Sequence, residues 1–339
     1  MKKIIISDVT LRDGNHVVNH QINLNIIKKY CSFAEEAKIP IIEIGHGNGL
    51  GASSLAIGRS AVSDKKALIA ARKLLKKTKL SVHSIPGFST LEDLKSAIDC
   101  GVDIIRVGCN STDIDIISKQ VEYCFKNKVE VWGVLMMFHL IYPNKKYLKL
   151  ASFLKDLGLK TLIIMDSSGS LLPKDIKNIF SSLNNKFKFN LGFHGHNNFG
   201  CAISNSLEAL DFGANIIDVS MQGFGAGAGN TQMEILLTLL EKDKKKLFIN
   251  LDLVYKQSEK FESLIRDNGL SYSKSFSEPM NILSAKYGLF SGFASHVNYY
   301  SNKFNLSKLD SFRKINEKKL VAGQEDLIMN ILYNLKNRK

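Results

Sequence analysis

Eight short hydrophobic segments recur along the chain, separated by longer stretches of mixed polarity. Each is rich in Ile, Val or Leu and lacks the strict alternation of a half-exposed strand, which is typical of parallel strands buried on both faces. The eight segments cover residues 4–9, 39–45, 80–87, 102–109, 129–137, 160–167, 190–196 and 215–221. The pattern therefore predicts eight buried strands.

An amphipathic stretch with helical spacing follows each of these segments. LNIIKKYCSFAEEAK follows the first and TQMEILLTLLEKD follows the last. Asn23, Ser63, Ser89 and Ser111 precede such stretches and are expected to cap the helices.

Eight strand–helix units fit within roughly the first 245 residues, the count and length of a closed (β/α)8 barrel, an α/β fold also called a TIM barrel. An open doubly wound sheet is the alternative, but no GxGxxG fingerprint follows the first strand. Beyond residue 250 the chain has helical patterns and no strand pattern. We expect a catalytic barrel over residues 1–250 and a small helical C-terminal domain over residues 251–339.

The composition is ordinary for a globular protein, with 45% hydrophobic and 23% charged residues among 339. No apolar run approaches the ~18 residues of a membrane span, and the N-terminus lacks the features of a secretory signal. The five cysteines are scattered without a CxxC pair, which favours a reducing compartment. We therefore expect a cytoplasmic protein that does not engage a membrane.

A net charge of +14, from 46 Lys and Arg against 32 Asp and Glu, raises the question of nucleic-acid binding. The lysines are spread in short pieces such as RKLLKKTK, and no nucleic-acid module is visible. We expect no nucleic-acid partner; attraction of an anionic small molecule is the milder interpretation.

Polar side chains gather where the predicted strands end, which is where TIM barrels carry their chemistry. Glu43 and Arg106 lie in the second and fourth segments. Six of the eight histidines also lie at strand ends, namely His16, His46, His83, His139, His194 and His196. Histidines scattered through a core would not collect there.

His194 and His196, in FHGHNN, are two residues apart, so they leave one face of a strand together. Two convergent imidazoles suit a divalent metal, although such a pair alone is weak evidence of one. Asp13 is the best candidate for an anionic ligand, because it follows the first strand, and in a closed barrel that strand lies close to the seventh. Its alternative role is that of a turn residue before Gly14. Three ligands would leave positions open for substrate and water.

Two neighbours of Asp13 suggest substrate chemistry. Arg12 carries a permanent charge and can fork onto a carboxylate or enolate, or else form a salt bridge across the barrel mouth. His16 can move protons near neutral pH, or else is a surface histidine. The glycine-rich GFGAGAGN at 223–230 could approach an anion or simply pack tightly.

The segments SDVTLRDGNH, EIGHGNGLGASS, VLMMFH, MDSSGS, FHGHNN, GAGAGN and LVAGQEDLIMNIL together resemble the 4-hydroxy-2-oxovalerate aldolase family. The similarity spans nearly the whole chain. TLRDG followed by HxHN is shared with a wider group of metal-dependent barrel lyases and synthases, whereas the GHGxGLGxSS and GQED segments are more particular to the aldolases.

The resemblance implies an aldolase that cleaves a 4-hydroxy-2-oxo acid to pyruvate and an aldehyde, or runs the reverse reaction. It implies Mn²⁺, or Mg²⁺ or Co²⁺ in its place, on Asp13, His194 and His196. Arg12 and Ser167 would hold the pyruvyl group, and His16 would take the proton from the 4-hydroxyl. We include His46, His83 and Phe290 among the residues expected to contact the substrate.

Three departures from the family pattern stand out. Phe290, in GLFSGF, replaces a family tyrosine tied to stereochemistry, and Tyr287 is the nearest candidate to substitute for it as a catalytic residue. VHSIPG replaces an apolar stretch that lines the aldehyde pocket, so His83 predicts a polar, sugar-like aldehyde. Asn48 replaces an aspartate near the mouth.

Two other functions remain open at this stage. One is a Claisen-type synthase of the same superfamily that condenses an acyl-CoA with a 2-oxo acid, and the other is a catalytically impaired regulatory barrel. The resemblance also implies an aldehyde dehydrogenase partner for the helical C-terminal region, and we expect a homo-oligomer.

Overall fold

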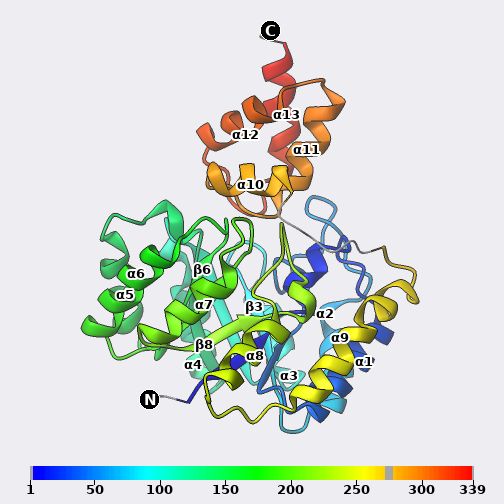
Figure 1. The fold of residues 1–339 in the computed structure, drawn as a ribbon, viewed down its shortest axis with the longest axis vertical. Coiled ribbons are helices and arrows are strands. Elements are labelled where there is room, and N and C mark those ends of the chain that lie inside the picture. The colour runs from blue at the N-terminus through cyan, green and yellow to red at the C-terminus, as the bar shows by residue number, and fades with distance from the viewer. Residues whose placement is uncertain (1–2, 272–277, 338–339) are drawn as a thin grey trace.

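Eight parallel strands close into a barrel in the computed structural model, which describes residues 3–271 and 278–337 (Figure 1). The strands pair in sequence order, and the last pairs with the first. They are β1 Ile5–Asp8, β2 Ile41–Glu43, β3 Lys79–Ser84, β4 Ile104–Asn110, β5 Glu130–Met136, β6 Thr161–Asp166, β7 Asn190–Gly195 and β8 Ala214–Val219. The predicted TIM barrel is confirmed, and the open sheet is excluded.

A ring of helices surrounds the strands (Figure 1). They are α1 Leu24–Glu36, α2 Asp64–Leu74, α3 Leu91–Asp99, α4 Ser118–Lys126, α5 Lys146–Asp156, α6 Pro173–Lys186, α7 Ala202–Asp211 and α8 Met233–Lys242. Their apolar stripes face the strands: Ile26, Tyr30 and Phe33 of α1 are buried because they recur at the spacing of one helix face.

The predicted helix caps hold in part. Asn23 caps α1, accepting hydrogen bonds from the backbone N–H groups of Asn25 and Ile26, and Ser63 holds the N-cap position of α2 without a side-chain bond. The other two caps are wrong. Thr90 rather than Ser89 caps α3, and a 3-10 turn, η2 Ile114–Ile117, separates Ser111 from α4.

The inside of the barrel has two levels, because every second strand residue points inward. The lower level is apolar and includes Ile41, Ile104, Trp132, Ile163 and Ile216. The upper level lies two residues further along β2, β4 and β8. Its buried side chains there are charged, namely Glu43, Arg106 and Asp218. The change from apolar to charged places the polar groups at the carboxyl end of the barrel.

Helix α9, Leu251–Arg266, packs on the barrel, where Val254 and Phe261 join its hydrophobic core. Four further helices form a second lobe at the top of Figure 1, namely α10 Pro279–Lys286, α11 Phe293–Lys303, α12 Lys308–Glu317 and α13 Glu325–Lys336. This helical domain has its own hydrophobic core. The boundary at residue 250 stays a prediction, and from the packing of α9 we infer a division between α9 and α10.

The helical domain is anchored to the carboxyl ends of the strands. Ser291 donates to the backbone oxygen of Ser167 through both its N–H (3.0 Å) and its hydroxyl (2.8 Å). His139 donates through Nε2 to the backbone oxygen of Gly288 at 2.8 Å. Within residues 3–271 and 278–337, no helix has the length and apolar character needed to span a membrane.

Candidate metal and substrate site

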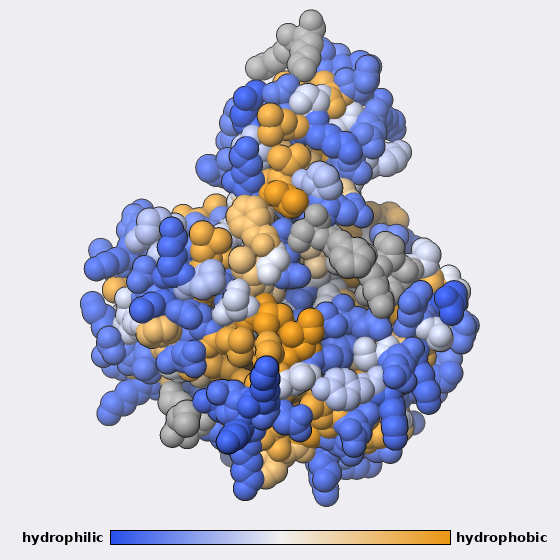
Figure 2. Space-filling view, in the orientation of Figure 1, coloured by the Kyte–Doolittle hydropathy of each residue, from blue (hydrophilic) through white to orange (hydrophobic). Residues whose placement is uncertain are grey.

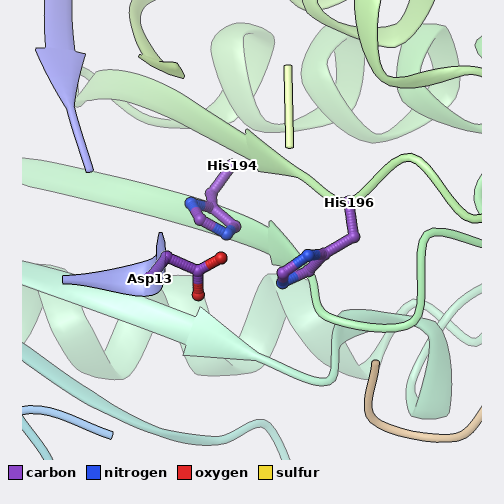
Figure 3. Close-up of side chains that lie close together, drawn as sticks. All are labelled: Asp13, His194 and His196. Carbon is purple, nitrogen blue, oxygen red and sulfur yellow. The ribbon is translucent and has the colours of Figure 1, made fainter. Parts of the chain in front are cut away.

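Three buried side chains meet at the carboxyl end of the barrel: Asp13, His194 and His196 (Figure 3). Asp13 opens η1 (Asp13–His16), a 3-10 turn just beyond β1, while His194 lies on β7 and His196 directly after it. One potential ligand atom from each lies within 4.8 Å of the others. The convergence expected from the sequence is therefore present in the fold.

The two imidazoles have their other ring nitrogens occupied. Nδ1 of His194 donates to Asp218 Oδ2 (3.0 Å), and Nδ1 of His196 donates to the backbone oxygen of Ala226 (3.2 Å). These bonds leave each Nε2 with a free lone pair, which is the form that binds a metal. Burial lowers the pKa of His196 to about 4, with Asp13 opposing the shift. Nε2 of His194 is buried and lacks a hydrogen-bond partner among the described residues.

Asp13 is held as an anion by its neighbours. Burial alone would raise its pKa, but the Arg12 charge and the nearby imidazoles hold the pKa well below its usual range. Its Oδ1 accepts from Arg12 Nη1 (2.6 Å), and its Oδ2 accepts from the Ala226 N–H (3.1 Å) and from Asn230 Nδ2 (2.8 Å). Two neutral imidazoles and one carboxylate match the donor set that a divalent ion takes in an open catalytic site.

The glycine-rich loop at 223–230 supports Asp13. A Cβ on Gly225 would lie 2.6 Å from Asp13 Oδ2, so a larger residue there would displace the carboxylate. The loop amides of Ala226 and Ala228 donate to Asp13 and to Asn198, respectively. Because these amides already have partners within the protein, the loop is a packing element around the site.

Arg12 faces the same centre. Its Nε donates to Glu43 Oε1 (2.5 Å), while its Nη2 is buried without a hydrogen-bond partner in the described part of the chain. Burial would lower the pKa of Arg12, but Glu43 and Asp13 raise it, so the guanidinium is permanently charged. The Nε and Nη1 bonds of Arg12 fix the orientation of its guanidinium, while Nη2 remains able to donate. This arrangement suits a side chain that is preoriented for an anionic ligand.

His16 ends η1 and is partly buried. Its ring packs so closely on Gly47 that a Cβ there would lie 2.4 Å from His16 Nε2. Burial lowers the pKa of His16, and the nearby Asp13 carboxylate only partly offsets the effect. A neutral imidazole in this position can accept a proton.

His46 stacks on His20, with ring centroids 3.5 Å apart. Its Nε2 donates to the backbone oxygen of Gly58 (3.1 Å), and its Nδ1 accepts from the Asn48 N–H (3.1 Å). Both ring nitrogens are therefore engaged in holding the loop after β2. Contact of His46 with a substrate stays a prediction.

His83 and Ser167 are both buried at this end of the barrel. His83 projects from β3, its exposed fraction is 2%, and neither ring nitrogen has a hydrogen-bond partner within the described residues. Burial lowers its pKa to about 3. Ser167 Oγ accepts from the Met137 N–H (2.9 Å), which leaves the hydroxyl hydrogen able to donate.

Phe290 and Tyr287 lie in different surroundings. The Phe290 ring is buried, with its centroid 6.0 Å from that of His16. Tyr287 directly follows α10 at its C-cap position, packs against the core of the helical domain, and has the Lys286 ammonium over its ring. The predicted catalytic role of Tyr287 stays a prediction.

A cavity of about 380 Å³ lies between the barrel mouth and the helical domain. Its lining includes His16, His20, Asn48, Ala226, Ser291 and His296. This cavity, which is lined by both polar and apolar residues, reaches His16 from outside the barrel.

Two family models match the chain. The HMGL-like model matches residues 3–261, and the DmpG-like communication domain matches residues 276–337. Among curated relatives, a 4-hydroxy-2-oxovalerate aldolase of Spirochaeta aurantia is 42% identical, over 99% of this chain and 97% of that protein. One from Pectobacterium atrosepticum is 39% identical, with the same two coverages.

The chain belongs to the 4-hydroxy-2-oxovalerate aldolase family. Among solved structures, the N-terminal domain of a putative aldolase from Bacteroides vulgatus matches this aldolase-family chain with a TM-score of 0.74 and 26% identity, over 89% of this chain and 98% of that one. The carboxyl transferase domain of Rhizobium etli pyruvate carboxylase matches with a TM-score of 0.84 over all of this chain and 61% of that one, but at 14% identity it is similar in fold alone.

Two polar residues around this aldolase-family site are missing from the sequence-based predictions. Asp218 orients His194, and Asn230 donates to Asp13 while its own Oδ1 is buried without a partner in the described part of the chain. A signal for Asp218 was present, since it is the one charged residue in the apolar segment 215–221. Asn230 ends the glycine-rich loop, and only the folded loop brings it to Asp13.

Proposed function

We propose that the chain is a divalent-metal-dependent pyruvate aldolase, which cleaves a 4-hydroxy-2-oxo acid to pyruvate and an aldehyde or forms it from them. One observation carries the proposal: Asp13, His194 and His196 converge beside Arg12, whose Nη2 has no hydrogen-bond partner among the described residues. The names of the relatives at 39–42% identity agree with this chemistry.

The buried charges support an ion and an anionic substrate in the same place. The cluster holds three carboxylates and two guanidinium groups, namely Asp13, Glu43, Asp218, Arg12 and Arg106. With neutral histidines its net charge is −1. A divalent cation and one monoanionic 2-oxo acid would bring the total to zero, which reduces the cost of burying charge.

The chain's own residues would divide the cleavage reaction between them. A bound divalent ion would supply Lewis-acid polarisation of the 2-oxo group. His16 takes the proton of the 4-hydroxyl, the C3–C4 bond breaks, and its electron pair passes into the pyruvate enolate as the aldehyde carbonyl forms. Arg12 donates to the enolate and carboxylate oxygens, where negative charge develops. Protonation at C3, with net release of the proton that His16 took up, then yields pyruvate and restores the neutral imidazole.

We propose Mn²⁺ as the working ion, with Mg²⁺ or Co²⁺ as substitutes. Two imidazole nitrogens favour a borderline ion, while the carboxylate and the oxygens of a keto acid are acceptable to Mn²⁺. Comparison of the rates after reconstitution with each ion tests this choice. Mn²⁺ should give the fastest pyruvate release, and an inactive Mn²⁺ form would contradict it.

The aldehyde is proposed to be polar. The neutral imidazole of His83 offers one donor and one acceptor, and neither has a hydrogen-bond partner among the described residues. Burying both without a partner costs free energy, which hydrogen bonds to a hydroxylated substrate would recover. Wild-type protein should therefore favour a 4,5-dihydroxy-2-oxo acid over 4-hydroxy-2-oxovalerate, and H83L should reduce that preference by about tenfold or more. Equal preference in the two proteins would contradict this assignment.

We propose that the helical domain docks an aldehyde dehydrogenase, which would consume the aldehyde product. Support comes from the match to the communication-domain model and from exposed Tyr299, Leu309 and Tyr333 on this lobe. Figure 2 shows hydrophobic residues among hydrophilic ones there. Size-exclusion chromatography with the dehydrogenase from the same organism should give a complex that Y299E weakens. Separate elution of the wild-type pair would contradict the proposal.

A homo-oligomer and a cytoplasmic location stay predictions.

A coupled assay tests the activity. With Mn²⁺ present, lactate dehydrogenase and NADH report pyruvate released from 4-hydroxy-2-oxo acids of varied polarity. Pyruvate release supports the aldolase. Release of free CoA from an acyl-CoA and a 2-oxo acid, without pyruvate release, would favour the Claisen-type synthase. Metal binding without either product would favour a regulatory barrel.

A further inference from the structure

Arg106 lies inside the barrel on β4 and is fully buried. Its Nη1 lies 3.0 Å from Glu43 Oε2, and its Nη2 donates to Asp218 Oδ2 at 2.5 Å. One planar guanidinium on β4 thus bridges two carboxylates from β2 and β8, the two strands that pair with β1.

Each of these carboxylates also holds one residue of the candidate site. Glu43 Oε1 accepts from Arg12 Nε (2.5 Å), and Asp218 Oδ2 accepts from His194 Nδ1 (3.0 Å). The order Arg12, Glu43, Arg106, Asp218, His194 therefore forms a continuous buried chain, which connects the residue that would bind the substrate anion to a residue that would bind the metal.

We propose that Arg106 is a positioning residue that orients Arg12 and His194 together. This inference rests on the proposed function, since it concerns the affinities for a divalent ion and for a 2-oxo acid. Arg106 has no hydrogen bond to the three candidate metal ligands in the described structure, so its effect passes through the two carboxylates.

The shape of the guanidinium explains why one residue can serve both ends. Its planar fork fixes the angle between the two carboxylates, whereas a lysine ammonium is a single point charge that cannot define it. Loss of the partner that orients a metal-binding histidine typically weakens metal affinity by about 10- to 100-fold. A network that served stability alone could be replaced by apolar side chains without loss of binding.

R106K tests the proposal, because it keeps the charge and removes the fork. The dissociation constant for Mn²⁺ is measured on metal-free protein by electron paramagnetic resonance, and that for pyruvate by calorimetry on the Mn²⁺-saturated protein. We expect both constants to rise by about tenfold or more. R72K is the matched control, because Arg72 pairs with Asp103 outside the barrel (2.7 Å), and it should change neither constant.

Folding is checked by near-ultraviolet circular dichroism. If R106K does not fold, the combined variant R106M, E43Q and D218N removes the network without leaving a buried charge unpaired, and it should lose both affinities to a similar extent. Wild-type affinities in a folded R106K or in the combined variant would overturn the proposal. Failure of the proposed function would differ, because wild-type protein itself would then release no pyruvate from any 4-hydroxy-2-oxo acid.

Discussion

The lower and upper levels of the barrel interior differ by only two residues along the same strands. Ile41 is followed by Glu43 on β2, Ile104 by Arg106 on β4, and Ile216 by Asp218 on β8. The lower side chains form an apolar cluster, and the upper ones form buried ion pairs. One strand thus serves stability at one end and chemistry at the other, so substitutions at the two levels should separate these properties.

The largest effect is expected at Asp13, which lies just beyond β1 and contacts the upper level through Arg12. D13N removes the carboxylate charge of the three-ligand cluster while keeping its size. We expect pyruvate release to fall by at least about 10³-fold, because the electrophilic assistance of a metal is worth several kcal/mol. The melting temperature should also fall, because D13N breaks the buried ion pair with Arg12, so turnover is compared on folded protein. Near-wild-type turnover by D13N would show that the upper level does not work as a metal site.

H16A should have the next largest effect. Removing a general base typically costs about 10²- to 10⁴-fold, and kcat should fall more than KM rises. Mn²⁺ affinity should stay unchanged, since His16 is not one of the three clustered ligands. Steady-state kinetics and a metal titration on one preparation measure both outcomes. A normal kcat in H16A would show that His16 is not the general base.

The lower level should respond in the opposite way. I216A leaves a cavity in the apolar cluster, where Ile216 is 1% exposed, and should lower the free energy of unfolding by about 2–5 kcal/mol. Measured on folded protein, kcat/KM should remain within about threefold of wild type, because the charged level above keeps its hydrogen bonds. Urea unfolding and the pyruvate assay give both numbers. An I216A variant with wild-type stability and no activity would contradict the prediction that the lower level contributes to stability and the upper level to chemistry.

Acid should lower the free energy of unfolding through the titratable groups at the carboxyl end of the barrel. The apolar lower level contains no titratable side chain and should not contribute. Burial is the main cause that lowers the pKa values of five histidines at the carboxyl end of the barrel and in the loops beyond it, to about 2 for His20, about 3 for His83, and about 4 for His46, His139 and His196. Between pH 6.5 and 4 the unfolded chain binds more protons at these histidines, so stability falls as the pH falls.

Two carboxyl groups oppose this trend. Burial raises the pKa values of Asp8 and Asp166 to about 6, so below pH 6 these groups bind protons more tightly in the folded state. Five histidines against two carboxyl groups leave a net loss of stability on the order of a few kcal/mol per pH unit. Urea unfolding of metal-free protein at pH 6.5, 5.5 and 4.5 measures the slope. A flat or rising stability would contradict the balance.

The smallest effect is expected from F290Y, which introduces the tyrosine that the resemblance to the family leads us to expect at this position. The ring already lies near His16, so an added hydroxyl should change kcat/KM by less than about tenfold while altering the ratio of C4 stereoisomers that are cleaved. Chiral analysis of the synthetic direction measures the ratio. Y287F is the companion variant, and a greater loss of activity there than in F290Y would support a catalytic role for Tyr287.

Much of this organisation could be predicted from the sequence. The eight apolar segments gave the barrel because buried parallel strands need continuous hydrophobic runs, and the two-residue spacing of His194 and His196 placed both imidazoles on one face. Asp13 followed from closure, which brings the first strand near the seventh.

The remaining features depend on contacts distant in sequence. Asp218 meets Arg106 only because β4 and β8 face each other across the closed barrel, and a one-residue pattern in one strand does not specify that pairing. Helix α9 looked like part of the appendage because its amphipathic pattern does not reveal which surface it covers. Ser111 failed as a cap because a 3-10 turn precedes α4, and local residue preferences do not exclude such a turn.

The most direct test of the central claim is a Mn²⁺ titration of chelator-stripped protein, followed by the rate of pyruvate release at each addition. We expect no measurable release without metal, a rise in proportion to added Mn²⁺, and a plateau at one equivalent per chain. A variant that lacks both His194 and His196 should show no tight Mn²⁺ binding. Undiminished pyruvate release after exhaustive chelation, or tight one-to-one binding that survives the loss of both histidines, would contradict the central claim.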